Sequence, residues 1–220
     1  MNLEPFTSLV LYGIFYLAIL IIWWQIRNYL KQKEELKTQL IRKNRTVRNY
    51  EVFINTLNIQ EKIELPEPVM IMGNEESDLE LTIFTSLYCE MCQEICETVN
   101  KILFAYEEEI KINIFFKKQP VEDKNRFLYI LHSIFLVQGT KEFLKALNFW
   151  FENKNLEPWI IAAEYNMEEN NKKFTSSNEW FTQNNIIATP SVFINGHIFP
   201  NEFEKEDLYY HIEGIIENKE

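Results

Sequence analysis

Cysteine, histidine and glycine are scarce in this chain of 220 residues, which has three, three and five of them. The histidines are scattered, and none has metal-ligand spacing to another. The glycines form no phosphate-binding loop, so no cofactor motif is present. The cysteines lie within eight residues of each other, which excludes a secreted scaffold stapled by bridges between distant segments. The chain therefore predicts local thiol chemistry, either redox or metal, at Cys89, Cys92 and Cys96.

Positive charge is also scarce over most of the chain. From residue 66 onward there are 13 Lys or Arg against 27 Asp or Glu, which gives a net charge of −14. Such a surface repels a phosphate backbone, so no nucleic-acid partner is expected for this region. The basic residues gather instead between residues 25 and 50, where there are eight of them and only two acidic residues, Glu34 and Glu35.

Residues 6–26 contain no charged side chain, and they end in an aromatic pair, Trp23 and Trp24. About 20 apolar residues are what a helix needs to cross the hydrocarbon core. A cleaved signal peptide is the rival interpretation, but no basic segment precedes the run and no small-residue cleavage site follows it. The sequence predicts a transmembrane anchor over residues 1–26 that contacts membrane lipid.

The anchor is followed by a basic segment, residues 27–65, whose leucines recur at helical spacing. We expect a helical stalk, which either touches anionic lipid headgroups or serves as a solvated spacer. Pro66 and Pro68 break any helix, so the globular domain is expected to span residues 66–220.

The domain has the element order of an α/β fold. A strand at residues 81–85, a helix at 92–109 and a strand at 111–116 form a βαβ unit with a parallel strand pair. Residues 121–184 predict a helical insertion, broken at Gly139 and Pro158. Asn195-Gly196 lies between two short apolar runs, which indicates a hairpin, and residues 204–217 form a last amphipathic helix.

Cys89 and Cys92 form a Cys-x-x-Cys pair at the junction of a strand and a helix, which is typical of thioredoxin-like redox domains. The unpaired N–H groups and the dipole at a helix N-terminus stabilise a thiolate, so Cys89 is the expected nucleophile. Cys92, one turn later, is the expected resolving thiol. The same spacing also forms half of a zinc or copper site, although the interpretation with no metal is preferred. Cys96 is either a core residue or a third redox thiol.

Thr189-Pro190 precedes the strand of the hairpin, at the position where thioredoxin-like domains carry a cis proline beside the cysteine pair. A cis turn exposes backbone groups that pair with an extended peptide. Thr189, Glu90 and Met91 are therefore the expected substrate contacts. The carboxylate of Glu90 should disfavour the Cys89 thiolate and oppose the helix dipole, so a strong oxidant is not expected.

Together, the strand at 81–84, the cysteine pair, the inserted helices and the Thr189–Gly196 run resemble the DsbA-type branch of the thioredoxin superfamily. Trp180 and residues 188–208 are similar to the C-terminal thioredoxin domain of bacterial vitamin K epoxide reductase fusions. The resemblance implies a thioredoxin-like fold with a helical insertion that exchanges disulfides with protein or peptide thiols.

In those fusions a bundle of membrane helices oxidises the attached domain, whereas the one apolar segment here contains no cysteine. The resemblance thus implies a separate membrane redox partner. It also implies a domain outside the cytoplasm, while the basic residues after the anchor favour the cytoplasmic side. The direction of electron flow stays open, as does the alternative of a redox-inactive scaffold that only binds a partner.

Overall fold

The computed structural model describes residues 4–155, 158–159 and 167–219 and has two compact units, Met1–Asn49 and Tyr50–Glu220. Part of the expected insertion, residues 156–157 and 160–166, lies outside the described residues.

The first unit is one helix, α1 (Glu4–Val47), of 44 residues. Its segment Tyr12–Ile41 is long and apolar enough to cross a membrane, a property that a signal sequence near the N-terminus shares. The helix continues without a break from the apolar run into the basic segment, because Lys, Gln, Glu and Leu are all good helix formers. The guanidinium of Arg27 lies 5.5 Å from the ring centroid of Trp23, at the point where the apolar run ends.

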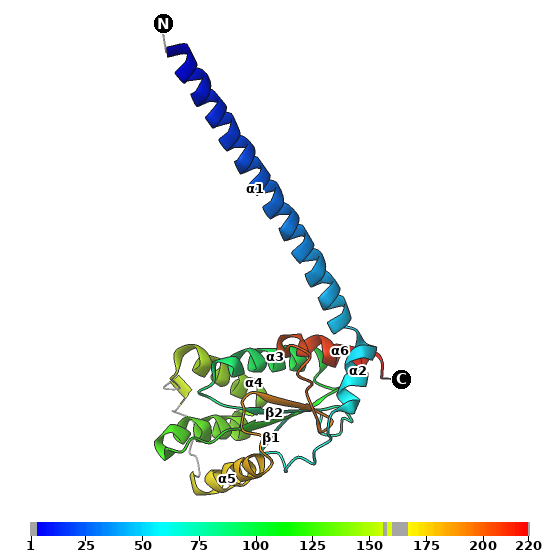
Figure 1. Ribbon diagram of the computed structural model, residues 1–220. Helices are drawn as coiled ribbons and strands as arrows, with labels where there is room; N and C mark the ends of the chain where they lie inside the picture. The colour runs from blue at the N-terminus through cyan, green and yellow to red at the C-terminus, as the bar shows by residue number, and fades with distance from the viewer. Residues whose placement is uncertain (1–3, 156–157, 160–166, 220) are drawn as a thin grey trace. The chain divides into compact units, whose positions relative to one another are not determined.

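The second unit is built on a five-stranded sheet in the order β1-β3-β2-β4-β5 (Figure 1). The strands are β1 (Met70–Gly73), β2 (Glu80–Thr85), β3 (Lys111–Phe116), β4 (Ser191–Ile194) and β5 (His197–Ile198). The central pair, β2 and β3, is parallel and is connected through α3 (Glu90–Tyr106), whereas the other pairs are antiparallel. The predicted α/β class and the parallel pair are confirmed.

Side chains alternate between the two faces of β2, so each face receives its own helices. Phe84 stacks on Phe181 of α5 (Met167–Gln183), with ring centroids 4.1 Å apart. Figure 1 shows α3 and α6 (Leu208–Glu217) on the side of the sheet opposite α5. Thr85, one residue after Phe84, is buried and points to the α3 side, where it meets the buried part of that helix.

The helical insertion starts with a short 3-10 helix, η1 (Glu122–Asn125), and continues as α4 (Arg126–Asn153). Gly139 interrupts α4 with a φ of +81° and non-helical ψ, at the break that the sequence predicts. The hairpin also forms as expected. Asn195 and Gly196, with φ values of +50° and +82°, make the turn between β4 and β5, because only such residues adopt positive φ at little cost.

The second unit begins at Tyr50, whereas the sequence predicts that the globular domain begins at residue 66. The helix α2 (Tyr50–Ile59) buries Phe53 and Leu57, which lie one turn apart on one face. The Phe53 ring stacks on His211 of α6, with centroids 3.9 Å apart. After α2, the N–H of Ile63 donates to the carbonyl of Gly196 at 2.9 Å. Residues 50–65 thus pack into the domain, because their apolar face completes its core.

Candidate active site

Cys89 lies immediately before α3, in extended conformation with φ −108° and ψ 121°. The loop that carries it comes straight from the end of β2 and is held by α4. The indole Nε1 of Trp150 donates to the carbonyl of Leu87 at 2.8 Å, and the Tyr88 ring packs edge-on against the same indole. The Tyr88 hydroxyl donates to the carbonyl of Lys124 at 2.8 Å. The insertion thereby fixes the position of the first cysteine.

The environment of Cys89 favours its thiolate. Partial burial raises the pKa of the Cys89 thiol. Hydrogen bonds from the side chains of Cys92 and Thr189 and from the backbone N–H groups of Cys92 and Met91 lower this pKa by more, so it lies below its usual value. N–H groups at the start of a helix are free to donate to an anion there. These contacts bring the two cysteine side chains together.

Cys92 and Cys96 lie on the buried face of α3, with 0% and 2% of their surface exposed. Burial raises the pKa of the Cys92 thiol to about 11, and burial also raises the pKa of Cys96. The neighbouring Thr85 side chain offsets part of the rise at both sulfurs. Among the described residues the Thr85 hydroxyl has no partner of its own, so it is free to donate to a thiolate formed beside it. No disulfide joins these three cysteines in this structure.

The Thr189–Pro190 peptide bond is cis, and it lies next to the cysteine pair. The Cys89 thiol donates to the carbonyl oxygen of Thr189 at 3.2 Å, across 100 residues of sequence. Pro190 itself is buried, while Thr189 is half-buried. Two segments that the sequence singled out separately thus meet at one sulfur atom.

Glu90 and Met91, between the two cysteines, are both exposed in the first turn of α3, and 62% of the Met91 surface is accessible. The sequence predicts that the Glu90 carboxylate opposes the Cys89 thiolate. In the structure, burial and hydrogen bonds act on the pKa of Cys89, and their balance lowers it. An exposed carboxylate is screened by water, so it has less effect than donors in direct contact with the sulfur.

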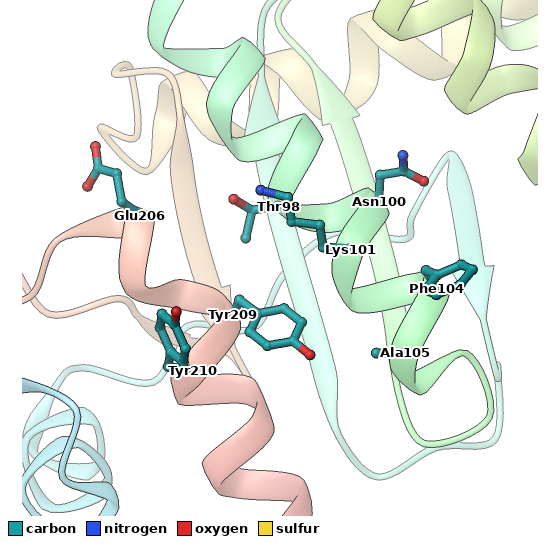
Figure 2. Close-up of a pocket in the computed structure, with 8 residues that line it drawn as sticks. All are labelled: Thr98, Asn100, Lys101, Phe104, Ala105, Glu206, Tyr209 and Tyr210. Carbon is teal, nitrogen blue, oxygen red and sulfur yellow. The ribbon is translucent and has the colours of Figure 1, made fainter.

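A groove leads away from the cysteine pair along α3. A hollow of about 320 Å³ begins at Met91 and Pro190, and a second hollow of about 700 Å³ adjoins it between α3 and α6. Lys101 and Glu206 line both hollows. Figure 2 shows the second hollow, where the Tyr209 side chain extends from α6 towards α3. Its full lining is Thr98, Asn100, Lys101, Phe104, Ala105, Glu206, Tyr209 and Tyr210.

Several residues at the site were not found from the sequence. Thr85 lies at the end of a strand whose sequence predicts only core packing. Trp150 lies in a helix whose sequence predicts only amphipathic packing. Lys117 and Lys205, which contact the cis-proline turn, look like ordinary surface cations. None of these residues belongs to a motif, and only the folded chain brings them to the cysteine pair and the cis-proline turn.

The three histidines of the chain lie outside this site. His132 and His211 are buried, and the Nδ1 atom of His197 lies 2.9 Å from the carbonyl oxygen of Gln60. In the described part of the chain, no group of three or more His, Cys, Asp or Glu side chains is arranged to hold a metal ion.

Comparison with known proteins agrees with this geometry. A family model described as Thioredoxin matches residues 66–214. A search of curated proteins gave no match. Among solved structures, a periplasmic thioredoxin-like protein from Salmonella enterica serovar Typhimurium has a TM-score of 0.53 at 16% identity, with 70% of this chain and 99% of that chain covered.

Two further structures are similar in the same way. Oxidised BdbD from Bacillus subtilis has a TM-score of 0.52 at 14% identity and covers 73% of this chain and 97% of its own. The thiol-disulfide exchange protein alpha-DsbA2 from Wolbachia pipientis has a TM-score of 0.51 at 11% identity and covers 80% of this chain and 98% of its own. At these identities the likeness shows the fold. Because the family match spans the whole sheet and the cysteine pair, the chain belongs to the thioredoxin family.

Proposed function

We propose that this protein is a thiol-disulfide oxidoreductase that exchanges disulfides with protein or peptide thiols through Cys89 and Cys92. The observation that carries the proposal is the contact between the Cys89 thiol and the carbonyl of Thr189, beside a cis proline. A reactive sulfur next to exposed backbone groups suits an extended peptide as substrate. The likeness to a thiol-disulfide exchange protein supports the same chemistry.

In the reducing direction, the Cys89 thiolate attacks one sulfur of a substrate disulfide. A mixed disulfide forms, and the other substrate sulfur leaves as a thiolate that takes up a proton. Cys92 then loses its proton and attacks the Cys89 sulfur, which releases the second substrate thiol. The pair ends as a Cys89–Cys92 disulfide, and two electrons have passed to the substrate. Oxidation of a substrate dithiol follows the same steps in reverse.

The unequal pKa values of the two cysteines suit their roles. The lowered pKa makes Cys89 the thiolate that attacks, and in the oxidising direction it makes Cys89 the better leaving group when a second substrate thiol attacks the substrate sulfur of the mixed disulfide. The raised pKa keeps Cys92 protonated and unreactive until a mixed disulfide forms beside it. The free Thr85 hydroxyl is placed to stabilise the Cys92 thiolate at that moment.

Thr189, Glu90 and Met91 are the proposed substrate contacts. A substrate cysteine bound to the Cys89 sulfur lies beside Thr189, and its peptide backbone replaces the Cys89 thiol as the donor to the Thr189 carbonyl. The exposed Met91 side chain offers a soft apolar surface at the mouth of the groove. The groove along α3 then receives the rest of the peptide.

We further propose that α1 is a retained membrane anchor, that the domain lies on the extracytoplasmic side, and that a separate membrane protein exchanges electrons with the pair. The length and apolarity of Tyr12–Ile41 support the anchor, and a periplasmic structural relative supports the side. The proposed partner rests on the resemblance to the vitamin K epoxide reductase fusions. The apolar segment of this chain has no cysteine, so it cannot pass electrons itself.

Trapping tests the proposed exchange. The Cys92→Ser variant should accumulate mixed disulfides through Cys89, because the resolving thiol is gone, and reductant should release them. The Cys89→Ser, Cys92→Ser double variant is the matched control and should trap nothing. A Cys92→Ser variant that traps no thiol protein, together with a wild-type chain inactive towards glutathione disulfide and reduced insulin, would refute the proposal.

Labelling in intact cells tests the orientation. A membrane-impermeant maleimide should label Cys89 from outside the cytoplasm, since this thiol is partly exposed and lies in the second unit. Labelling only after the membrane is permeabilised would place the domain in the cytoplasm.

A further inference from the structure

The turn that contains the cis proline, residues 187–190, is held by side chains at each of its carbonyl groups. Lys117 Nζ donates to the carbonyl of Ile187 at 2.8 Å, and the Ser191 hydroxyl donates to the carbonyl of Ala188 at 2.8 Å. The Cys89 thiol donates to the carbonyl of Thr189, and Lys205 Nζ donates to the carbonyl of Pro190. Four consecutive carbonyls thus have four side-chain donors.

Two of these donors are cations that approach from different elements. Lys117 follows β3 directly, and its backbone N–H donates to the carbonyl of Thr85 at 2.7 Å, at the end of β2. Lys205 opens the 3-10 helix η3 (Lys205–Asp207) ahead of α6. One lysine therefore ties the turn to the strand that leads into the cysteine loop, and the other ties it to the helix that borders the groove.

Lys117 and Lys205 bind backbone carbonyls, which is an unusual choice in a domain rich in carboxylates. Residues 66–220 carry a net charge of −14, so carboxylates are abundant. Within the described part of the chain, neither the Lys117 nor the Lys205 ammonium pairs with a carboxylate, and the ion pairs formed there involve other lysines, such as Lys111 with Glu80 and Lys118 with Glu122. Hydrogen bonds from a charged donor are stronger than neutral ones, so the two lysines are suited to fix this backbone segment more firmly than the Ser191 hydroxyl and the Cys89 thiol do.

We propose that Lys117 and Lys205 are positioning residues that clamp the cis-proline turn from both sides, so that the backbone of Thr189 stays opposite the Cys89 sulfur for an incoming peptide. This rests on the proposed disulfide exchange and names what aligns its peptide substrate. When a peptide binds, the Cys89 thiol no longer occupies the Thr189 carbonyl, while the three remaining donors still hold the turn. The clamp thus presents a rigid backbone edge to the substrate.

A peptide disulfide and glutathione disulfide separate the clamp from the chemistry. An extended peptide needs the Thr189 backbone in register, whereas the small disulfide needs mainly the Cys89 thiolate. Lys205→Met and Lys117→Met keep the length of the side chain and remove the charged donor. Each should slow exchange with the peptide by about tenfold or more relative to exchange with glutathione disulfide, because small misplacements at a reacting centre have large effects on rate.

The controls use lysines of the same domain. Lys205→Arg keeps a cationic donor and should restore the ratio of the two rates. Lys118→Met removes a neighbouring lysine that binds Thr175 of α5 and pairs with Glu122, away from the turn. It should lower the thermal unfolding midpoint and leave the ratio unchanged, as expected of a purely structural lysine.

The outcomes separate the clamp from the proposed function. An unchanged ratio in both Met variants, or an equal loss with Lys118→Met, would overturn the clamp while wild-type exchange stands. If the wild-type chain exchanges with neither disulfide, the proposed function is overturned and the clamp with it. A fall in the ratio for the Met variants that Arg restores is the result expected.

Discussion

The two cysteines of the pair should differ in their rate of alkylation at neutral pH, and the structure sets the direction and a lower limit. At pH 7 a thiol with a pKa of 9.0, the value from which the pKa of Cys89 is lowered, is about 1% thiolate. Cys92, with its pKa raised to about 11, is about 0.01% thiolate at that pH. The thiolate fraction of Cys89 therefore exceeds that of Cys92 by at least about 100-fold.

Part of this advantage is lost because a more basic thiolate is a better nucleophile. With a Brønsted slope of about 0.4–0.5, a pKa difference of about 2 returns about 6- to 10-fold to Cys92. Cys89 should therefore react at least about 10-fold faster than Cys92 with iodoacetamide, before access is counted. Cys92 has no exposed surface, which widens the gap further.

Peptide mass spectrometry of the reduced full-length chain after timed alkylation measures both rates. Cys96, which is buried and has a raised pKa, should react slowly as well. In urea the three rates should converge, which shows that the difference comes from the fold. Equal rates in the folded chain, or Cys92 labelled first, would refute the assignment of Cys89 as nucleophile.

Three further outcomes follow from the packing and the site. Phe53→Ala should lower the free energy of unfolding by about 3–5 kcal/mol, because the ring is fully buried, whereas Ile59→Ala on the same helix, 82% exposed, should cost less than about 0.5 kcal/mol in urea titrations. Thr85→Val should raise the pKa of Cys92 above about 11 and lengthen the life of the mixed disulfide in single-turnover assays, since the hydroxyl that lowers this pKa is lost; an unchanged lifetime would exclude a role for Thr85. Gly73→Ala should destabilise the domain by more than about 1 kcal/mol, as its φ is +77° and a Cβ there would lie 2.3 Å from the Ile110 carbonyl oxygen; a neutral result in thermal unfolding would contradict that geometry.

Local residue patterns made much of the fold predictable. Residues 81–85 and 111–116 carry β-branched and aromatic side chains around a helical segment, and this local pattern fixes a parallel pair. Asn195-Gly196 likewise determines the hairpin through its backbone preference alone. Cys89 at the start of α3 follows from the same local rule.

Contacts between distant segments were not predictable. Phe53 and Leu57 lie in the segment that the sequence predicts as a helical stalk, and only their packing in the core beside α6 shows that α2 belongs to the domain. Lys117 and Lys205 are single cations in an acidic sequence, and their importance appears only when the cis-proline turn lies beside them. A short sequence window contains neither partner, so no periodicity can reveal these contacts.

The pairing of Cys89 with Cys92 is tested most directly by a redox titration of the full-length chain. The chain is equilibrated with mixtures of reduced and oxidised glutathione, quenched in acid, and its disulfides are mapped by mass spectrometry. A single two-electron transition is expected, in which Cys89 and Cys92 lose their thiols together and Cys96 stays reduced. A chain that keeps all three thiols across the titration, or that joins Cys96 in place of one of the pair, would contradict the account.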